Sequence, residues 1–225
     1  MSITSLLLLA WACGSDTSDT PSASDSPTVK QEAKATEDKG SDQKTILFFG
    51  NSLTAAYGLN PEEGFTALIQ NRIDSLELAY QVVNSGSSGE TTAGGFARID
   101  WVLAQQPFDI FVLELGGNDA LRGTPTEEAY KNLKGIIKKV KTERPGVKVV
   151  LAGMEAPPNL GGEYTSAFRQ VYRRLATEEE ASLIPFLLDG VGGVRELNQE
   201  DGIHPTAAGH RLLADNIWVV LSKIL

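Results

Sequence analysis

The chain has 225 residues, of which 41% are hydrophobic and 7% aromatic, and its formal net charge is −9. An acidic chain is a poor candidate for binding nucleic acid, because attraction to phosphates dominates that affinity. Its single cysteine, Cys13, and two histidines allow no internal disulfide and no cysteine- or histidine-rich zinc site, so we expect neither a metal nor another cofactor.

The N-terminal segment, residues 1–13, has the length of a signal peptide, and its apolar core is too short to span a bilayer. Its apolar run, 6–12, ends in small residues directly before Cys13. This arrangement resembles a bacterial lipoprotein cleavage box, which implies a lipid on Cys13, membrane attachment and a periplasmic or surface-exposed place in the bacterial cell envelope. No Lys or Arg precedes the run, and a plain secretory signal is the alternative. Residues 14–44 are rich in Ser, Thr, Asp and Pro, so we expect a disordered linker.

Residues 45–225 alternate between apolar strands and amphipathic helices. The expected strands are 45–50, 81–84, 110–115, 148–154 and 183–188. The expected helices are 61–76, opening at Pro61, and 92–105, 126–142, 164–179 and 206–224. Apolar strands joined by helical crossovers indicate a parallel sheet that is covered on both faces. We therefore predict one α/β domain, a three-layer α/β/α arrangement with five parallel strands in the flavodoxin-like order 2-1-3-4-5.

The first predicted strand ends at Gly50, and Ser52 stands two residues beyond it. Ligands of open α/β sheets bind outside the carboxyl ends of the strands, which places the Ser52 hydroxyl where chemistry is usually done. Asn and Ser are also common helix caps, so this stretch alone leaves a capping role open.

The later strand-to-helix loops bring further polar residues to the same edge of the sheet, namely Gly89, Asn118, Asp201 and His204. A serine nucleophile needs a base, and the base needs an acceptor that orients it, roles that His204 and Asp201 can fill. The backbone N–H groups of Ser52 and Gly89 and the side-chain amide of Asn118 can donate to a developing oxyanion. A surface histidine beside a solvated loop acid is the alternative.

Four motifs stand in order along the chain: GNSL at 50–53, Gly89, GGND at 116–119 and DGIHP at 201–205. Together they resemble the four blocks of the SGNH hydrolases, or GDSL esterases and lipases, and most closely the bacterial thioesterase, arylesterase and lysophospholipase branch. The resemblance implies Ser52 as the nucleophile, completed by Asp201 and His204, with Ser52, Gly89 and Asn118 in the oxyanion hole. Position 51 is Asn where that family has Asp. This removes a negative charge beside the nucleophile, and we expect an altered hydrogen-bond pattern near Ser52.

We therefore expect a monomeric serine ester hydrolase of arylesterase, acyl-thioesterase or lysophospholipase type. It would cleave small acyl esters through an acyl-enzyme on Ser52. Tyr57, Leu121 and Leu160 are candidates for lining an open, shallow substrate cleft, although all three can equally be loop-packing residues. One alternative is a carbohydrate O-deacetylase or O-acetyltransferase with the same triad. Another is a catalytically silent surface lipoprotein that only binds.

Overall fold

The computed structural model describes residues 43–225. The predicted signal segment, Cys13 and almost all of the predicted linker lie outside the described residues. Over residues 43–225, no helix combines the length and the apolarity needed to cross a membrane.

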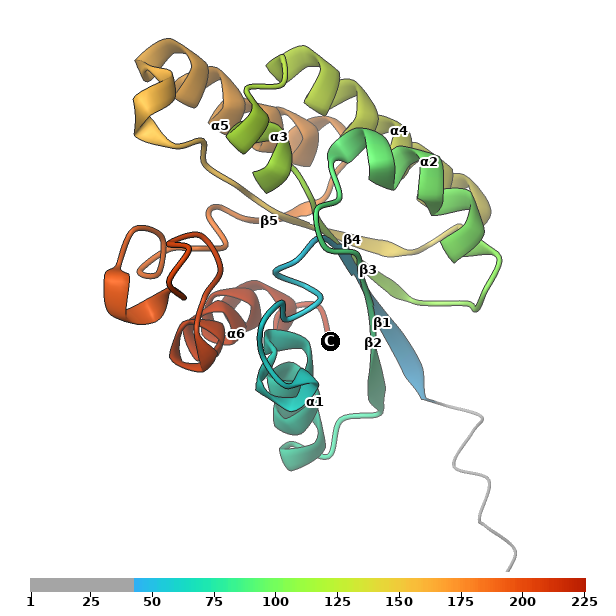
Figure 1. The fold of residues 1–225 in the computed structure, drawn as a ribbon. Helices are drawn as coiled ribbons and strands as arrows, with labels where there is room; N and C mark the ends of the chain where they lie inside the picture. The colour runs from blue at the N-terminus through green and yellow to red at the C-terminus, as the bar shows by residue number, and fades with distance from the viewer. Residues whose placement is uncertain (1–42) are drawn as a thin grey trace, which may run out of the picture. The chain divides into compact units, whose positions relative to one another are not determined.

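Five parallel strands form one sheet in the order β2-β1-β3-β4-β5 (Figure 1), which confirms the predicted strand order. The strands are Lys44–Gly50 (β1), Tyr80–Gly86 (β2), Ile110–Glu114 (β3), Lys148–Ala152 (β4) and Ser182–Ile184 (β5). The inner strands β1, β3 and β4 are apolar runs with almost completely buried side chains. This burial is expected for a parallel sheet with helices on both faces.

Six α-helices in the described part of the chain cover the sheet. They are Phe65–Ser75 (α1), Thr92–Leu103 (α2), Gly117–Arg122 (α3), Thr126–Glu143 (α4), Gly162–Glu178 (α5) and Ala207–Leu221 (α6). Helices α1 and α6 pack together on one face, and α2, α4 and α5 lie side by side on the other (Figure 1). The predicted three-layer α/β/α architecture is confirmed.

The structure differs from the predicted elements mainly in three places. The last strand ends at Ile184, because Pro185 follows and has no N–H to continue the ladder. The short helix α3 was not predicted. The helix predicted over 61–76 is divided into a 3-10 turn, Pro61–Glu63, and α1, which ends at Ser75.

Candidate active site

Ser52 lies in a tight turn directly after β1. The turn is closed by hydrogen bonds from the Ala55 N–H to the Asn51 carbonyl and from the Tyr57 N–H to the Ser52 carbonyl, both 3.0 Å. The capping role left open for Ser52 is not observed, because the next α-helix begins at Phe65. A Cβ at Gly50 would stand 2.1 Å from Thr54 Oγ1, so only glycine fits at the start of the turn.

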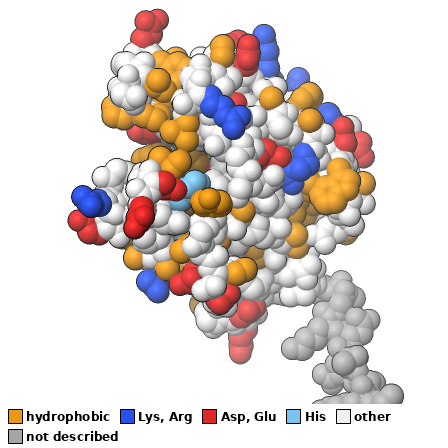
Figure 2. Space-filling model, in the orientation of Figure 1, with side chains coloured by type: hydrophobic (Ala, Val, Ile, Leu, Met, Phe, Trp, Pro, Cys, Tyr) orange, Lys and Arg blue, Asp and Glu red, His pale blue; other side chains and the backbone are white. Residues whose placement is uncertain are grey.

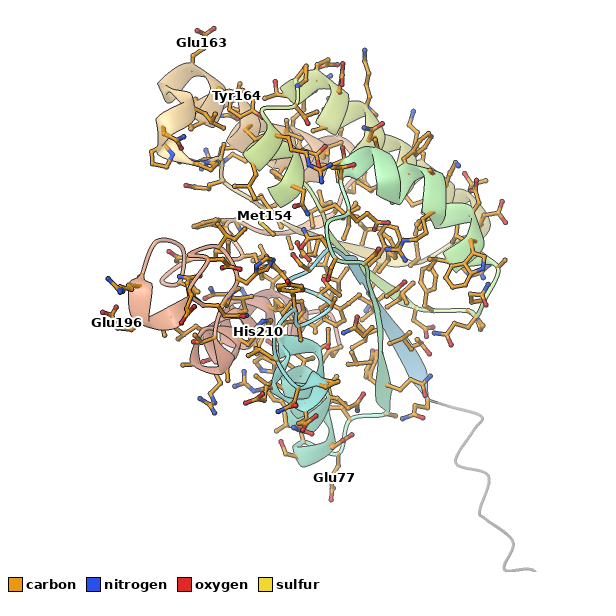
Figure 3. The ribbon with its side chains drawn as sticks, viewed as in Figure 1. Glu77, Met154, Glu163, Tyr164, Glu196 and His210 are labelled. Carbon is orange, nitrogen blue, oxygen red and sulfur yellow. The ribbon has the colours of Figure 1, made fainter. Side chains whose placement is uncertain are left out.

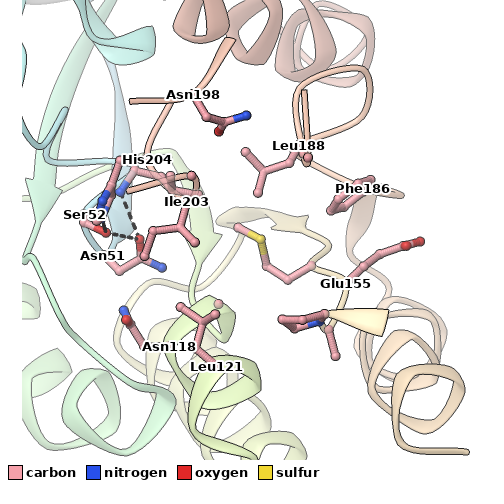
Figure 4. Close-up of a pocket in the computed structure, with 18 of the residues that line it drawn as sticks. Asn51, Ser52, Asn118, Leu121, Glu155, Phe186, Leu188, Asn198, Ile203 and His204 are labelled. Carbon is pink, nitrogen blue, oxygen red and sulfur yellow. Dashed lines mark hydrogen bonds between the residues drawn. The ribbon is translucent and has the colours of Figure 1, made fainter. Parts of the chain in front are cut away.

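Ser52, His204 and Asp201 form a continuous chain of hydrogen bonds. Ser52 Oγ lies 2.9 Å from His204 Nε2 (Figure 4). Asp201 Oδ2 lies 2.6 Å from His204 Nδ1. The fold thus brings together two segments that lie 152 residues apart in the sequence. The surface-histidine alternative fails, because His204 has a specific partner on each ring nitrogen.

Asp201 is oriented by its own turn. Its Oδ1 accepts hydrogen bonds from the backbone N–H groups of Ile203 and His204, each at 3.0 Å, and Gly202 supplies the positive φ of +75°. The hydrogen bond with His204, supported by the two backbone bonds, lowers the pKa of Asp201 to about 2. Asp201 is therefore ionised at neutral pH. It favours the imidazole tautomer with hydrogen on Nδ1, which leaves the Nε2 lone pair facing the Ser52 hydroxyl.

Tyr57 covers the imidazole instead of lining the substrate pocket. Its ring centroid is 4.6 Å from that of His204, with the planes at 40°. Gln199 Nε2 donates to the carbonyl of Tyr57 at 2.8 Å and to that of Pro205 at 3.0 Å. These contacts tie the loop of the serine to the loop of the histidine.

Glu114, at the carboxyl end of β3, lies buried beneath the Ser52 turn. One of its oxygens accepts from Asn51 Nδ2 at 2.8 Å. The other accepts from Thr54 Oγ1 at 2.7 Å and from the backbone N–H groups of Asn51 and Thr54 at 3.1 and 3.3 Å. Burial raises the pKa of Glu114 to about 7, although these hydrogen bonds oppose the shift. Sequence reasoning gave Glu114 no role, and the available signal was a carboxylate inside a buried apolar strand.

Asn51 connects Glu114 to the nucleophile. Its Nδ2 bonds the Glu114 carboxylate, while its Oδ1 accepts from the Leu53 N–H at 2.9 Å and lies 3.4 Å from Ser52 Oγ. The side chain therefore holds the turn that carries Ser52.

The two remaining oxyanion candidates come from the loop after β2 and from the start of α3. Asn118 lines the same pocket as Ser52 and His204, and its Nδ2 donates to the carbonyl of Glu90 at 3.0 Å. Gly89 immediately precedes Glu90 and has a φ of +80°. Gly89 itself is not among the residues that line the pocket.

A cavity of about 490 Å³ opens beside Ser52 and His204 (Figure 4). Its volume lies in the usual range for small-molecule sites. Much of its lining is apolar: Leu121, Met154, Ala156, Phe186, Leu188 and Ile203. Leu121 thus lines the pocket as expected, whereas Tyr57 and Leu160 do not. Leu160 belongs to a short 3-10 turn, Pro158–Leu160, next to the rim residues Pro157 and Pro158.

The surface around the site is mixed. Figure 2 shows one histidine at the surface, with hydrophobic side chains on either side of it and acidic side chains next to it. It is His204, because His210 is only 1% exposed and lies between α6 and α1 (Figure 3). Within residues 43–225, no group of three or more His, Cys, Asp or Glu side chains is placed to hold a metal ion.

A serine hydroxyl bonded to an imidazole that is bonded in turn to a carboxylate, at the carboxyl edge of a parallel sheet, defines a serine hydrolase. Residues 48–212 match the model of the GDSL-like lipase/acylhydrolase family, and the chain belongs to this family. Its relatives are esterases, and the protein is a serine-dependent carboxylic ester hydrolase, as predicted.

Three relatives illustrate the likeness. Esterase TesA from Pseudomonas aeruginosa is 43% identical over 182 residues, which cover 81% of this chain and 90% of that protein. Thioesterase 1/protease 1/lysophospholipase L1 from Escherichia coli is 33% identical over 171 residues, covering 76% and 80%. The crystal structure of the psychrotrophic esterase EstA from Pseudoalteromonas sp., inhibited by monoethylphosphonate, has 32% identity and a TM-score of 0.76, with 81% and 98% coverage.

Proposed function

We propose that Ser52 is the nucleophile of this esterase, His204 its general base and acid, and Asp201 the carboxylate that orients the imidazole. The observation that carries the proposal is the 2.9 Å contact between Ser52 Oγ and His204 Nε2, backed by Asp201 on the other nitrogen. Ser52 Oγ attacks the acyl carbonyl while its proton passes to His204 Nε2, and the imidazolium then protonates the leaving alcohol or thiol. Water, deprotonated by His204, then attacks the acyl carbon. The bond from this carbon to Ser52 Oγ breaks, the acid leaves, and His204 returns the proton to Ser52 Oγ.

The negative charge that develops on the carbonyl oxygen needs fixed donors. We assign this role to the backbone N–H groups of Ser52 and Gly89 and to the Asn118 amide. The Asn118 amide has two hydrogens, and the hydrogen bond to the Glu90 carbonyl engages one of them. The other hydrogen is available to the substrate.

The substrates we propose are small acyl or aryl esters, thioesters or lysophospholipids, with the acyl group in the 490 Å³ cavity. Two polar side chains of the cavity are engaged within the protein and offer less to a sugar. The Asn198 amide donates to the carbonyls of Val191 and Val194, and Glu155 accepts from Arg169. These contacts favour an acyl ester over the carbohydrate alternative, and the preassembled hydrogen-bonded chain disfavours a silent binding protein.

Fluorophosphonate labelling followed by peptide mass spectrometry tests the assignment. We expect one adduct per chain, on Ser52, in the wild type and a strongly slowed reaction in His204→Ala. Turnover of short p-nitrophenyl esters is compared with acetate release from acetylated xylan, and we expect only the former. A folded wild type without an adduct on Ser52 would overturn the proposal.

We also propose that the enzyme is a monomer tethered in the cell envelope by a lipid on Cys13, on the basis of the small residues before that cysteine. Mass spectrometry of the mature N-terminus should find a lipidated Cys13 peptide, and light scattering of the 45–225 domain should give the monomer mass. A mature chain that begins elsewhere would refute the tether.

A further inference from the structure

Arg98, on the second turn of α2, makes an unusually complete set of contacts. Its Nε and Nη2 donate to the two carboxylate oxygens of Glu90 at 2.7 and 2.6 Å. Its Nη1 and Nη2 donate to the side chain and the carbonyl of Ser85, both at 3.0 Å. The guanidinium carbon also lies 4.2 Å from the ring centroid of Phe49. A bidentate guanidinium–carboxylate pair fixes the direction as well as the distance of its partner.

This pair is well shielded from solvent. The Glu90 side chain is 7% exposed and that of Arg98 is 22% exposed. Ser85 belongs to β2 and Phe49 to β1, the strand that leads into the Ser52 turn. Arg98 therefore holds Glu90 against β2 and against β1, the strand that leads into the Ser52 turn.

Glu90 supports two oxyanion donors at once. Its backbone follows directly on Gly89, and its carbonyl accepts the Asn118 amide at 3.0 Å. The Glu90 N–H closes the turn onto the Ser87 carbonyl at 3.1 Å. A shift of this one residue would therefore displace both the Gly89 N–H and the Asn118 amide.

We propose that Arg98 is a positioning residue for ester hydrolysis, which acts through Glu90 to hold the Gly89 N–H and the Asn118 amide against the developing oxyanion. Arg98 does not line the pocket. The inference rests on the proposed function, because it takes Gly89 and Asn118 as oxyanion donors. Donors preorganised for the transition state raise kcat, and small displacements of them lower it.

Arg98→Met and Glu90→Gln test the inference. Methionine keeps apolar contact with Phe49 and removes the guanidinium, and glutamine keeps the size of Glu90 and removes its charge. Loss of one oxyanion donor lowers kcat roughly 100- to 1,000-fold, so we expect partial displacement of two donors to lower it about 10- to 100-fold. KM for p-nitrophenyl acetate should stay within about threefold, because ground-state binding is untouched. Both variants break the same contact, the one between Arg98 and Glu90. The kcat of the double variant should therefore be little lower than that of the worse single variant.

Arg72→Met is the matched control. Arg72 also pairs with a carboxylate, Asp215 at 2.7 Å, and also lies over an aromatic ring, that of Trp218 at 5.3 Å. It joins α1 to α6 on the opposite face of the sheet, so its removal should leave kcat unchanged. Thermal melting shows whether each variant is folded. Titration with a fluorophosphonate measures the fraction of chains that have a reactive Ser52.

Two results would overturn the inference: an undiminished kcat in folded Arg98→Met, or a double variant whose losses multiply. Should Arg98→Met not fold, Arg98→Lys and Glu90→Gln carry the test. We expect the same reduction of kcat, about 10- to 100-fold, in Glu90→Gln and a smaller one in Arg98→Lys. A kcat loss matched by an equal loss of titratable Ser52 would show a structural role only. A wild type that fails to label at Ser52 would instead overturn the proposed function, so the two failures are distinguishable.

Discussion

Replacing Glu114 by Gln probes the contact beneath the nucleophile most directly. The new carbonyl oxygen can take over the three hydrogen bonds from Thr54 and the Asn51 N–H. The new NH₂ group must then face Asn51 Nδ2, which donates at 2.8 Å to the carboxylate oxygen it replaces. Two donors meet without an acceptor. A buried polar group left in this way costs about 1–3 kcal/mol of unfolding free energy.

The same substitution removes a titrating group, so it also changes how the free energy of unfolding depends on pH. The pKa of Glu114 is raised from 4.5 to about 7, so the folded state binds this proton more tightly than the unfolded state. Its contribution to stability is fully present below pH 4.5 and is lost as the pH rises through 7. The loss amounts to about 3 kcal/mol, at 1.36 kcal/mol for each pH unit. The stability of the wild type relative to Glu114→Gln should therefore fall between pH 4.5 and pH 8.

A double variant, Asn51→Asp with Glu114→Gln, exchanges the amide and the carboxylate between the two positions. The introduced glutamine NH₂ then faces the introduced carboxylate, and every donor has an acceptor again. Urea unfolding of the wild type, both single variants and the double variant at pH 5 and pH 8 measures the coupling. We expect the double variant to recover about 1–3 kcal/mol relative to the sum of the single variants. A Glu114→Gln variant as stable as the wild type at pH 5, or strictly additive effects, would refute the reasoning.

Two further predictions concern the histidines. His204→Ala should lower kcat for p-nitrophenyl acetate by roughly 10⁴- to 10⁶-fold with an unchanged melting temperature, and substantial remaining turnover would mean that another group is the base. Burial lowers the pKa of His210 from 6.5 to about 4, so its contribution to stability is complete above pH 6.5 and is lost as the pH falls through 4. Over this pH window, urea unfolding should show the free energy of unfolding of the wild type falling by about 3 kcal/mol relative to His210→Gln. The amide oxygen of the glutamine can still accept from the Phe65 N–H. Parallel pH profiles for the two proteins would contradict this prediction.

Much of the fold could be predicted because the strands are continuous apolar runs and the helices between them have clear amphipathic spacing. Helix α3 could not, since it is six residues long and contains Gly117, Asn118 and Asp119, which are weak helix formers. Its N-cap is Gly116, whose φ is +116°, and the helix is stabilised by its surroundings rather than by propensity. Pro185 indicates the early end of β5, but the residues after it are apolar and suggest that the strand continues.

The hydrogen-bonded chain at the site could be predicted because topology alone places the loops of Ser52 and His204 at one edge of the sheet. The supporting contacts could not. Glu114 reaches the Ser52 turn because the parallel register sets it beside Gly50, and register is a property of the assembled sheet. Arg98 reaches Glu90 across eight residues that include the start of a helix, a separation that gives no hint of contact. Side chains that act through a neighbour leave little trace in sequence spacing.

The structure also changes the meaning of Asn51. A carboxylate at this position would stand about 2.8 Å from that of Glu114, the distance now spanned by the Asn51 amide. Two like charges at that separation repel by about 6 kcal/mol at an effective dielectric constant of 20, so the pair would keep one proton through neutral pH. Two carboxylates that share one proton would carry the same net charge as Asn51 beside Glu114 above pH 7, where Glu114 is ionised. In that pH range we expect Asn51 to leave the net charge of the nucleophile turn unchanged. Two carboxylates would have to share a proton that can dissociate. In its place Asn51 has an amide hydrogen that cannot, so Asn51 Nδ2 can donate to Glu114 at every pH.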